Sequence, residues 1–108
     1  MGGLQLSLSV SPGSYRVGYK TPLTITASAA CYCQLYHRDQ AGRYELVFST
    51  EDPIPPGPYW LGNLTIVPPP GSEEFLLVGS LTHIVRDRIV VSNIPPLTVV
   101  VVPIQVIP

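Results

Sequence analysis

Hydrophobic and polar residues alternate along much of this chain with a period of two, which is typical of β-strands that bury one face. In residues 4–10, leucine and valine alternate with glutamine and serine, and Pro12-Gly13 then ends the pattern. The same alternation, or a short apolar run, recurs at residues 22–29, 31–38, 43–49, 59–67, 74–80, 88–91 and 97–107. We therefore expect short β-strands over these ranges.

Proline- and glycine-rich segments such as "EDPIPPGP" and "PPPG" separate the expected strands. Turn signals at a spacing of roughly 8–12 residues are typical of a β-sandwich or a β-barrel. Between residues 81 and 88, one helical turn competes with the strand interpretation. Pro103 has no N–H to donate, so we expect the last strand to lie at a sheet edge or to contain a bulge there.

Length and charge exclude several classes of protein. The 108 residues suffice for a single domain, residues 1–108, with a modest core. Only 12% of the residues are charged, against roughly 25% in typical soluble domains, and the formal net charge is -1. The six basic residues are scattered, whereas nucleic acids and anionic membranes attract a concentrated basic surface. No apolar run is long enough for a membrane helix, so we expect neither nucleic-acid binding nor membrane insertion.

Residues 29–48 predict a β-hairpin. Asp39 and Gly42 occupy the first and fourth positions of a type I turn, where glycine accepts a positive φ at little cost. With the usual bulge at Gly42, the pairing of the two strands follows. The expected cross-strand pairs are Asp39 with Arg43, His37 with Glu45, Leu35 with Val47, and Cys33 with Ser49.

The two faces of this hairpin differ in composition. Because aromatic side chains bury the largest area, we expect the aromatic face to line the interior of the sandwich. The other face, with Cys31, Cys33 and Leu35, is also fairly apolar, which indicates a central strand or one covered by a neighbour. The aromatic face comprises Tyr32, Tyr36, Tyr44, Leu46 and Phe48.

Cys31 and Cys33 suggest zinc, a disulfide or simple packing. Structural zinc sites use cysteines two to four residues apart on a knuckle, and here His37 would need His83 or Glu45 to complete the ligand set. A disulfide between same-face residues of one strand lies near the upper limit of about 6.8 Å between Cα atoms, so it would strain the strand. We expect two free thiols that pack in the core, with no metal and no cofactor.

No set of residues predicts catalysis. A nucleophile needs a base within hydrogen-bond reach and a third group that orients the base. His37 and His83 lie in expected strands or strand ends, and the sequence contains no G-x-S-x-G segment. Glu73 and Glu74 are adjacent, so on a strand their side chains point to opposite faces. We therefore do not expect an enzyme.

Four aromatic residues beside glycine or proline form the candidate interaction surface: Tyr15, Tyr19, Tyr59 and Trp60. Exposed aromatic side chains on loops often recognise peptides or sugars. The alternative is that they fill the ends of the sandwich, because tryptophan is largely buried in most proteins.

Several segments, taken in chain order, carry a family resemblance. They are Tyr15-Arg16-Val17-Gly18, the tyrosine-rich residues 32–36, Asp39 to Gly42, Leu46-Val47-Phe48, Ile54-Pro55-Pro56-Gly57 and Pro70-Gly71-Ser72-Glu73. This series resembles a bacterial family of unknown function, the domain-of-unknown-function family numbered 4384. The resemblance covers residues 5–80.

The resemblance implies an immunoglobulin-like architecture, so the complete fold prediction is an all-β, antiparallel immunoglobulin-like β-sandwich of about seven short strands. Members of the family are attached to caspase-like peptidases, protein kinases and envelope or surface proteins, and have no established activity. The resemblance thus implies an accessory module without catalytic residues. It leaves the compartment open and favours the cell envelope over the cytoplasm.

Two functional hypotheses follow. Few charges with 45% hydrophobic residues favour a module that binds another protein, another domain of its own chain, or a second copy through the edge of its last strand. The alternative is a cell-surface carbohydrate-binding module that uses the loop aromatics Tyr59 and Trp60. A small enzyme would need two ionisable residues that converge in a cavity.

Overall fold

The computed structural model describes residues 4–81 and 97–108, and these residues form eight β-strands. None of them forms a helix that is long and apolar enough to span a membrane. The strands are β1 (Leu6–Leu8), β2 (Gly13–Arg16), β3 (Lys20–Ala27), β4 (Tyr32–Arg38), β5 (Tyr44–Ser49), β6 (Gly57–Thr65), β7 (Gly71–Ser80) and β8 (Leu97–Ile107).

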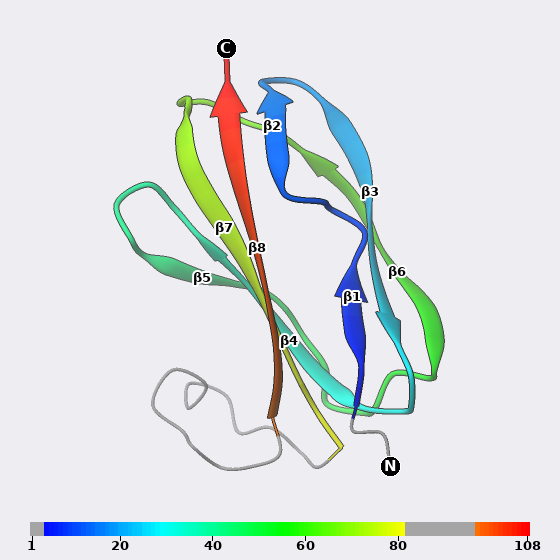
Figure 1. Cartoon of the computed structure of the whole chain (residues 1–108). Helices are drawn as coiled ribbons and strands as arrows, with labels where there is room; N and C mark the ends of the chain where they lie inside the picture. The colour runs from blue at the N-terminus through cyan, green and yellow to red at the C-terminus, as the bar shows by residue number, and fades with distance from the viewer. Residues whose placement is uncertain (1–3, 82–96) are drawn as a thin grey trace.

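The strands form two sheets that pack face to face (Figure 1). One sheet has the order β1-β3-β6, and the other has the order β2-β8-β7-β4-β5. All neighbours run antiparallel except β2 and β8, which are parallel. This arrangement confirms the all-β sandwich, with eight strands where about seven were expected. The parallel β2–β8 pair departs from the antiparallel pairing expected throughout.

The core fills the space between the sheets with alternate side chains of each strand. On β3, Leu23, Ile25 and Ala27 point inward, as the alternation predicted. They meet the inward side chains of the larger sheet, of which Leu35 and Leu77 have no exposed surface. Burial of a leucine or isoleucine contributes roughly 1.5–3 kcal/mol, so these residues dominate the stability of the sandwich.

The turn between β4 and β5 forms as predicted. The Gly42 N–H donates to the Asp39 carbonyl at 3.0 Å, and the Asp39 N–H donates to the Arg43 carbonyl at 2.9 Å. The Asp39 side chain accepts the N–H groups of Ala41 and Arg43, each at 2.9 Å, which lowers the pKa of its carboxyl. Gly42 has a φ of 84°, the conformation for which the turn needs glycine.

Beyond the turn, the predicted register is only partly correct. His37 lies opposite Glu45, as expected, but a shift between Leu35 and Tyr36 then changes the pairing. Leu35 therefore faces Phe48 rather than Val47, and the predicted opposition of Cys33 to Ser49 is wrong. The extra residue of this bulge is Val47.

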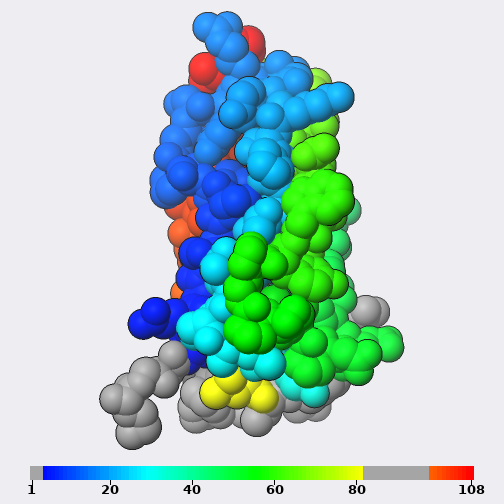
Figure 2. Space-filling view, turned by 90° about the vertical axis from the view of Figure 1, so that its right-hand side faces the viewer, coloured from blue at the N-terminus to red at the C-terminus, as the bar shows by residue number. Residues whose placement is uncertain are grey.

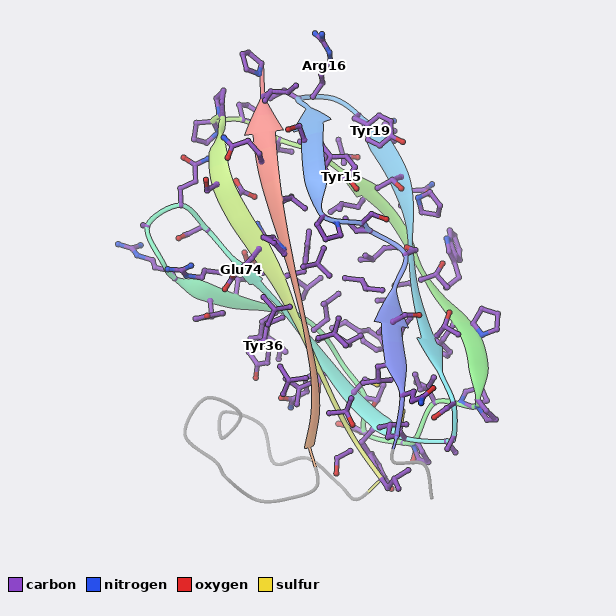
Figure 3. All side chains as sticks on the ribbon, in the orientation of Figure 1. Tyr15, Arg16, Tyr19, Tyr36 and Glu74 are labelled. Carbon is purple, nitrogen blue, oxygen red and sulfur yellow. The ribbon has the colours of Figure 1, made fainter. Side chains whose placement is uncertain are left out.

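The prediction that the aromatic face of the hairpin lines the interior was wrong except at Phe48, which the bulge turns towards the core. Cys31, Cys33 and Leu35 belong to the core between the sheets, whereas Tyr36 lies on the outer face (Figure 3). The physical reason is that β4 is an inner strand of the larger sheet, where Tyr36 and Gln34 are buried on the outer side as well. Aromatic content therefore does not distinguish the two faces.

The prediction for the last strand was partly correct, because among the described strands β8 is a sheet edge as far as Pro103 and an inner strand beyond it. β8 lies between β7 and β2, and its register with β7 runs from Leu97 to Val106 without a bulge. The partner that the alternation did not reveal is β2, which pairs with Ile104–Ile107 only. Pro103 precedes this pairing directly, where β8 has β7 alone as a partner among the described strands, so the missing N–H is tolerated. The strand expected at residues 88–91, and the competing helical turn beyond Leu81, lie outside the described residues.

Candidate functional site

The four aromatic residues singled out from the sequence do not share one surface. Tyr15 and Tyr19 lie together, with ring centroids 5.7 Å apart (Figure 3). Tyr15 and Tyr59 pack against the core, as residues that fill the sandwich do. The side chain of Trp60 points outward and is 65% exposed, so the interpretation that these aromatics fill the sandwich does not hold for it.

Tyr59 and Trp60 separate because they are neighbours on a strand rather than on a loop. Both belong to β6, where successive side chains point to opposite faces. Tyr59 packs inward beside Phe48, with ring centroids 6.0 Å apart. Trp60 stands opposite Thr24 on the outer face of the smaller sheet.

The outer face of the larger sheet presents a different surface, which we call the five-stranded face. The register aligns its outward side chains in rows across the strands, such as Tyr36, Leu76 and Val101. On its three central strands the face consists of Gln34, Tyr36 and Arg38 on β4, Ser72, Glu74, Leu76 and Val78 on β7, and Val99, Val101, Pro103 and Gln105 on β8.

Burial changes across this face. Gln34, Tyr36 and Val78 are buried, and the Tyr36 hydroxyl donates a hydrogen bond to Gln34 Oε1 at 2.9 Å. On β8, in contrast, Val99 is 53% exposed and Val101 is 50% exposed. The five-stranded face thus has a buried centre and an apolar border that faces solvent.

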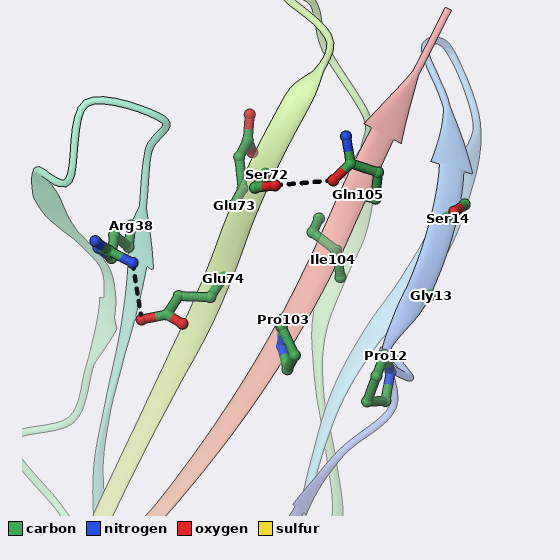
Figure 4. Close-up of a pocket in the computed structure, with 10 residues that line it drawn as sticks. All are labelled: Pro12, Gly13, Ser14, Arg38, Ser72, Glu73, Glu74, Pro103, Ile104 and Gln105. Atoms are coloured by element: carbon green, nitrogen blue, oxygen red, sulfur yellow. Dashed lines mark hydrogen bonds and ion pairs between the residues drawn. The ribbon is translucent and has the colours of Figure 1, made fainter.

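The polar end of the same face contains a shallow cavity of about 410 Å³ (Figure 4). Across it, Arg38 Nη1 lies 3.7 Å from Glu74 Oε1, and the Ser72 hydroxyl donates to Gln105 Oε1 at 2.8 Å. The Tyr44 hydroxyl also donates to Glu74, at 3.4 Å. One positive and one negative side chain therefore stand together beside the exposed valines.

The pair of residues closest to acid–base chemistry is His37 and Glu73. His37 Nε2 lies 2.6 Å from Glu73 Oε1, and the Gln40 amide donates to the other Glu73 oxygen at 3.4 Å. Beside them, a mostly apolar cavity of about 170 Å³ opens between the sheets, lined among others by Phe75. A histidine and a carboxylate supply two members of a catalytic triad, but no described serine, threonine or cysteine donates to His37.

The two cysteines are buried in the core and are not bonded to each other. Their sulfur atoms lie 3.6 Å apart, which agrees with the prediction of two free thiols that pack in the core. Burial, and then the hydrogen bond with Cys31, raise the pKa of Cys33 to about 12. At neutral pH the Cys33 thiol therefore stays protonated and is a poor nucleophile and metal ligand. Within residues 4–81 and 97–108, no three histidine, cysteine or acidic side chains gather as a metal site requires.

The sequence did not single out the exposed valines or the Arg38–Glu74 and His37–Glu73 pairs. Four consecutive valines at residues 99–102 predict a strand buried on both faces, whereas the outward members are exposed. The ion pairs join residues more than 30 positions apart in the chain, so only the order of strands brings them together.

No model of a known protein family matches the chain, and the comparison with curated proteins finds no matching sequence. The resemblance to the domain-of-unknown-function family 4384 therefore stays a prediction.

Proposed function

We propose that this chain is a non-catalytic β-sandwich module that binds another protein through its five-stranded face, in the first instance a second copy of itself. The observation that carries the proposal is the exposure of Val99 and Val101 on β8, beside the exposed Pro103. The same face would serve equally to dock the module on a neighbouring domain of its own protein.

The exposed valines supply a hydrophobic driving force. Each has about half of its surface in contact with water, so complete burial against a partner contributes roughly 1 kcal/mol per valine. The flanking Pro103 and the half-buried Leu76 extend this apolar border without adding charge.

The charges on the face support a second copy as partner. A twofold interface brings the same surface of each chain together, so each charged group needs its opposite on that same surface. The five-stranded face carries Arg38 and Glu74 side by side, which meets this requirement. A formal net charge of -1 for the whole chain opposes association very little.

The state of the ionisable and nucleophilic side chains supports binding rather than catalysis. Glu73 already accepts hydrogen bonds from His37 and Gln40, and the thiols of Cys31 and Cys33 lie in the core. The proposed interface also differs from the edge-strand association expected from the sequence, because it uses the outward side chains of β8 rather than its backbone.

Light scattering coupled to size exclusion tests the proposal, with the full chain loaded at about 1 μM to 1 mM, which brackets dissociation constants of that size. We expect the mass to rise from one chain towards two. Val101→Glu places a carboxylate within the interface and should weaken association at least about tenfold. The matched control is Val67→Glu, because Val67 is similarly exposed but lies outside the five-stranded face, beside the cavity between the sheets.

Two results would contradict the proposal. A chain that stays monomeric at every concentration would exclude a second copy as partner. Equal effects of Val101→Glu and Val67→Glu, with both variants folded by circular dichroism, would exclude the five-stranded face as the interface.

A further inference from the structure

The outer face of the smaller sheet, which we call the three-stranded face, carries a second and different arrangement of side chains. Figure 2 views the molecule from this side, with β1, β3 and β6 in blue to green across the surface. The outward side chains are Gln5, Ser7 and Ser9 on and beside β1, Pro22, Thr24, Thr26 and Ser28 on and beside β3, and Pro58, Trp60, Asn63 and Thr65 on β6.

Trp60 is the feature of this face that packing does not explain. It is the only tryptophan of the chain, and its side chain is 65% exposed, whereas tryptophan is highly buried in most proteins. A bulge follows it directly, because Thr24 pairs with Trp60 while Leu23 pairs with Gly62. Bulges of this kind re-aim side chains and recur next to functional sites.

Polar side chains extend from the indole across β3 to β1. The side chains of Ser7, Thr24, Thr26 and Gln5 make no hydrogen bond to any described residue. A shallow cavity of about 260 Å³ is lined by Gln5, Ser7, Thr26 and Ser28. Thr24 is the residue opposite Trp60, and Thr26, which lines the cavity, is two residues further along β3. The cavity therefore begins about 7 Å along the strand from the Thr24–Trp60 pair.

Charge distinguishes this face from the rest of the surface. Among its described outward positions the only charged side chain is Lys20, which lies at the far end of β3, opposite Thr65. A surface of hydroxyls and two amides matches an uncharged, hydroxylated ligand, because hydrogen bonds can form without desolvating a charge.

We propose that the three-stranded face binds a neutral oligosaccharide. The apolar face of one sugar ring stacks on the Trp60 indole, and the hydroxyls of the next ring bond to Thr26, Ser7 and Gln5 in the cavity. Because these two contacts lie about 7 Å apart, a single sugar cannot make both, and the site selects oligomers over monosaccharides.

A protein partner at Trp60 is the competing occupant, since tryptophan is frequent in protein interfaces. Such an interface requires a continuous apolar centre around the aromatic anchor. Here the neighbours of Trp60 on β3 are threonine and proline, and serines follow on β1, so the composition favours the sugar.

Fluorescence of Trp60 and titration calorimetry of the full chain test this site. The probes are β-1,4-linked oligomers of glucose, xylose, mannose and N-acetylglucosamine, their monosaccharides, and an acidic galacturonate oligomer, each up to about 10 mM. We expect a saturable change in Trp60 emission with at least one neutral oligomer, and at least about tenfold weaker binding of its monosaccharide.

Variants locate the binding. By calorimetry, Trp60→Ala should abolish binding and Thr26→Ala should weaken it about three- to tenfold. Tyr44→Ala is the matched control, because Tyr44 is an exposed aromatic residue on the other sheet, and it should leave binding unchanged. Val101→Glu should also leave it unchanged, which separates this inference from the proposed protein interface.

Three results would overturn the inference. They are the absence of binding by every neutral oligomer, binding that survives Trp60→Ala in a folded variant, and binding of the acidic oligomer alone. Loss of self-association in Trp60→Ala would instead assign the indole to a protein interface.

Discussion

The two outer faces of this sandwich differ in how deeply their side chains are buried and in which kinds of side chain they expose. The five-stranded face buries Gln34, Tyr36 and Val78 at its centre and exposes valines at its border. The three-stranded face exposes hydroxyls throughout and presents one large aromatic side chain, Trp60. Both cover the same core, so the difference between them does not arise from the side chains packed between the sheets.

The amino-acid sequences of the individual strands already show this difference. β3 reads "KTPLTITA", in which apolar and hydroxyl residues alternate, so one of its faces suffices to bury the apolar side chains. β7 reads "GSEEFLLVGS" and β8 reads "LTVVVVPIQVI", in which apolar residues follow one another. Consecutive apolar residues place hydrophobic side chains on both faces of a sheet, and the outer members then need cover or a partner.

An aspartate substitution on each face should give the largest difference in the free energy of unfolding. Val78→Asp on the five-stranded face places a carboxylate at a fully buried position and should cost at least about 3 kcal/mol of unfolding free energy. Thr26→Asp on the three-stranded face stays exposed and should change that free energy by less than about 0.5 kcal/mol. Urea unfolding followed by circular dichroism measures both.

If Val78→Asp does not fold, alanine variants of two cross-strand neighbours make the same test. Val78 and Val99 are paired across β7 and β8, but only Val78 is buried. Val78→Ala should cost about 2 kcal/mol and Val99→Ala less than about 0.5 kcal/mol. Equal costs at the two positions would show that the centre of the five-stranded face is not buried.

Alkaline pH should weaken the core that both faces share. The pKa of Cys33 is raised from 9.0 to about 12 in the folded chain, chiefly by burial. The unfolded chain therefore releases the thiol proton at lower pH than the folded chain does. This contribution to stability is constant below pH 9 and falls by about 1.4 kcal/mol per pH unit as the pH rises from 9 towards 12.

Urea unfolding from about pH 7 to pH 11 measures this slope, and the double variant Cys31→Ala/Cys33→Ala provides the control. The variant should be less stable at neutral pH because it loses core volume, but its stability should fall less steeply above pH 9. An identical alkaline slope in both chains would contradict a buried, protonated Cys33.

The smallest expected effect is the coupling between the two faces, which should be nearly zero. Val101 and Trp60 lie on different sheets and are paired with different residues, Leu76 and Thr24, so their effects on unfolding should add within about 0.5 kcal/mol. A double-mutant cycle with Val101→Glu and Trp60→Ala, measured by urea unfolding, tests this. A larger coupling would mean that the faces act as one site.

Much of the fold could be predicted from the sequence. Alternation located seven of the eight strands, and the range 97–107 agrees with β8 at both ends. The missing strand, β2, has only four residues and follows the breaker Pro12, so no periodicity could develop. Its parallel pairing with the end of β8 depends on the path of the chain between the sheets, which local pattern does not encode.

The surfaces were harder to predict than the strands. Trp60 was a candidate from composition, but its exposure depends on which face of β6 turns outward and on the bulge that follows. The inward face of β4 was predicted wrongly because both of its faces are buried, so hydrophobicity carries no information about direction. Pairs such as His37 with Glu73 depend on the order β7-β4 in the sheet, which required the complete topology.

Backbone amide NMR of the full chain tests the division between the two faces most directly. The spectrum is first recorded at increasing chain concentrations. It is then recorded at low chain concentration while a neutral oligosaccharide that binds in the calorimetric titration is added. We predict that concentration shifts the amides of Val99, Val101 and Glu74, and that the sugar shifts those of Thr24, Thr26 and Trp60. Shifts of the same residues in both series, or concentration-dependent shifts confined to the three-stranded face, would contradict the account.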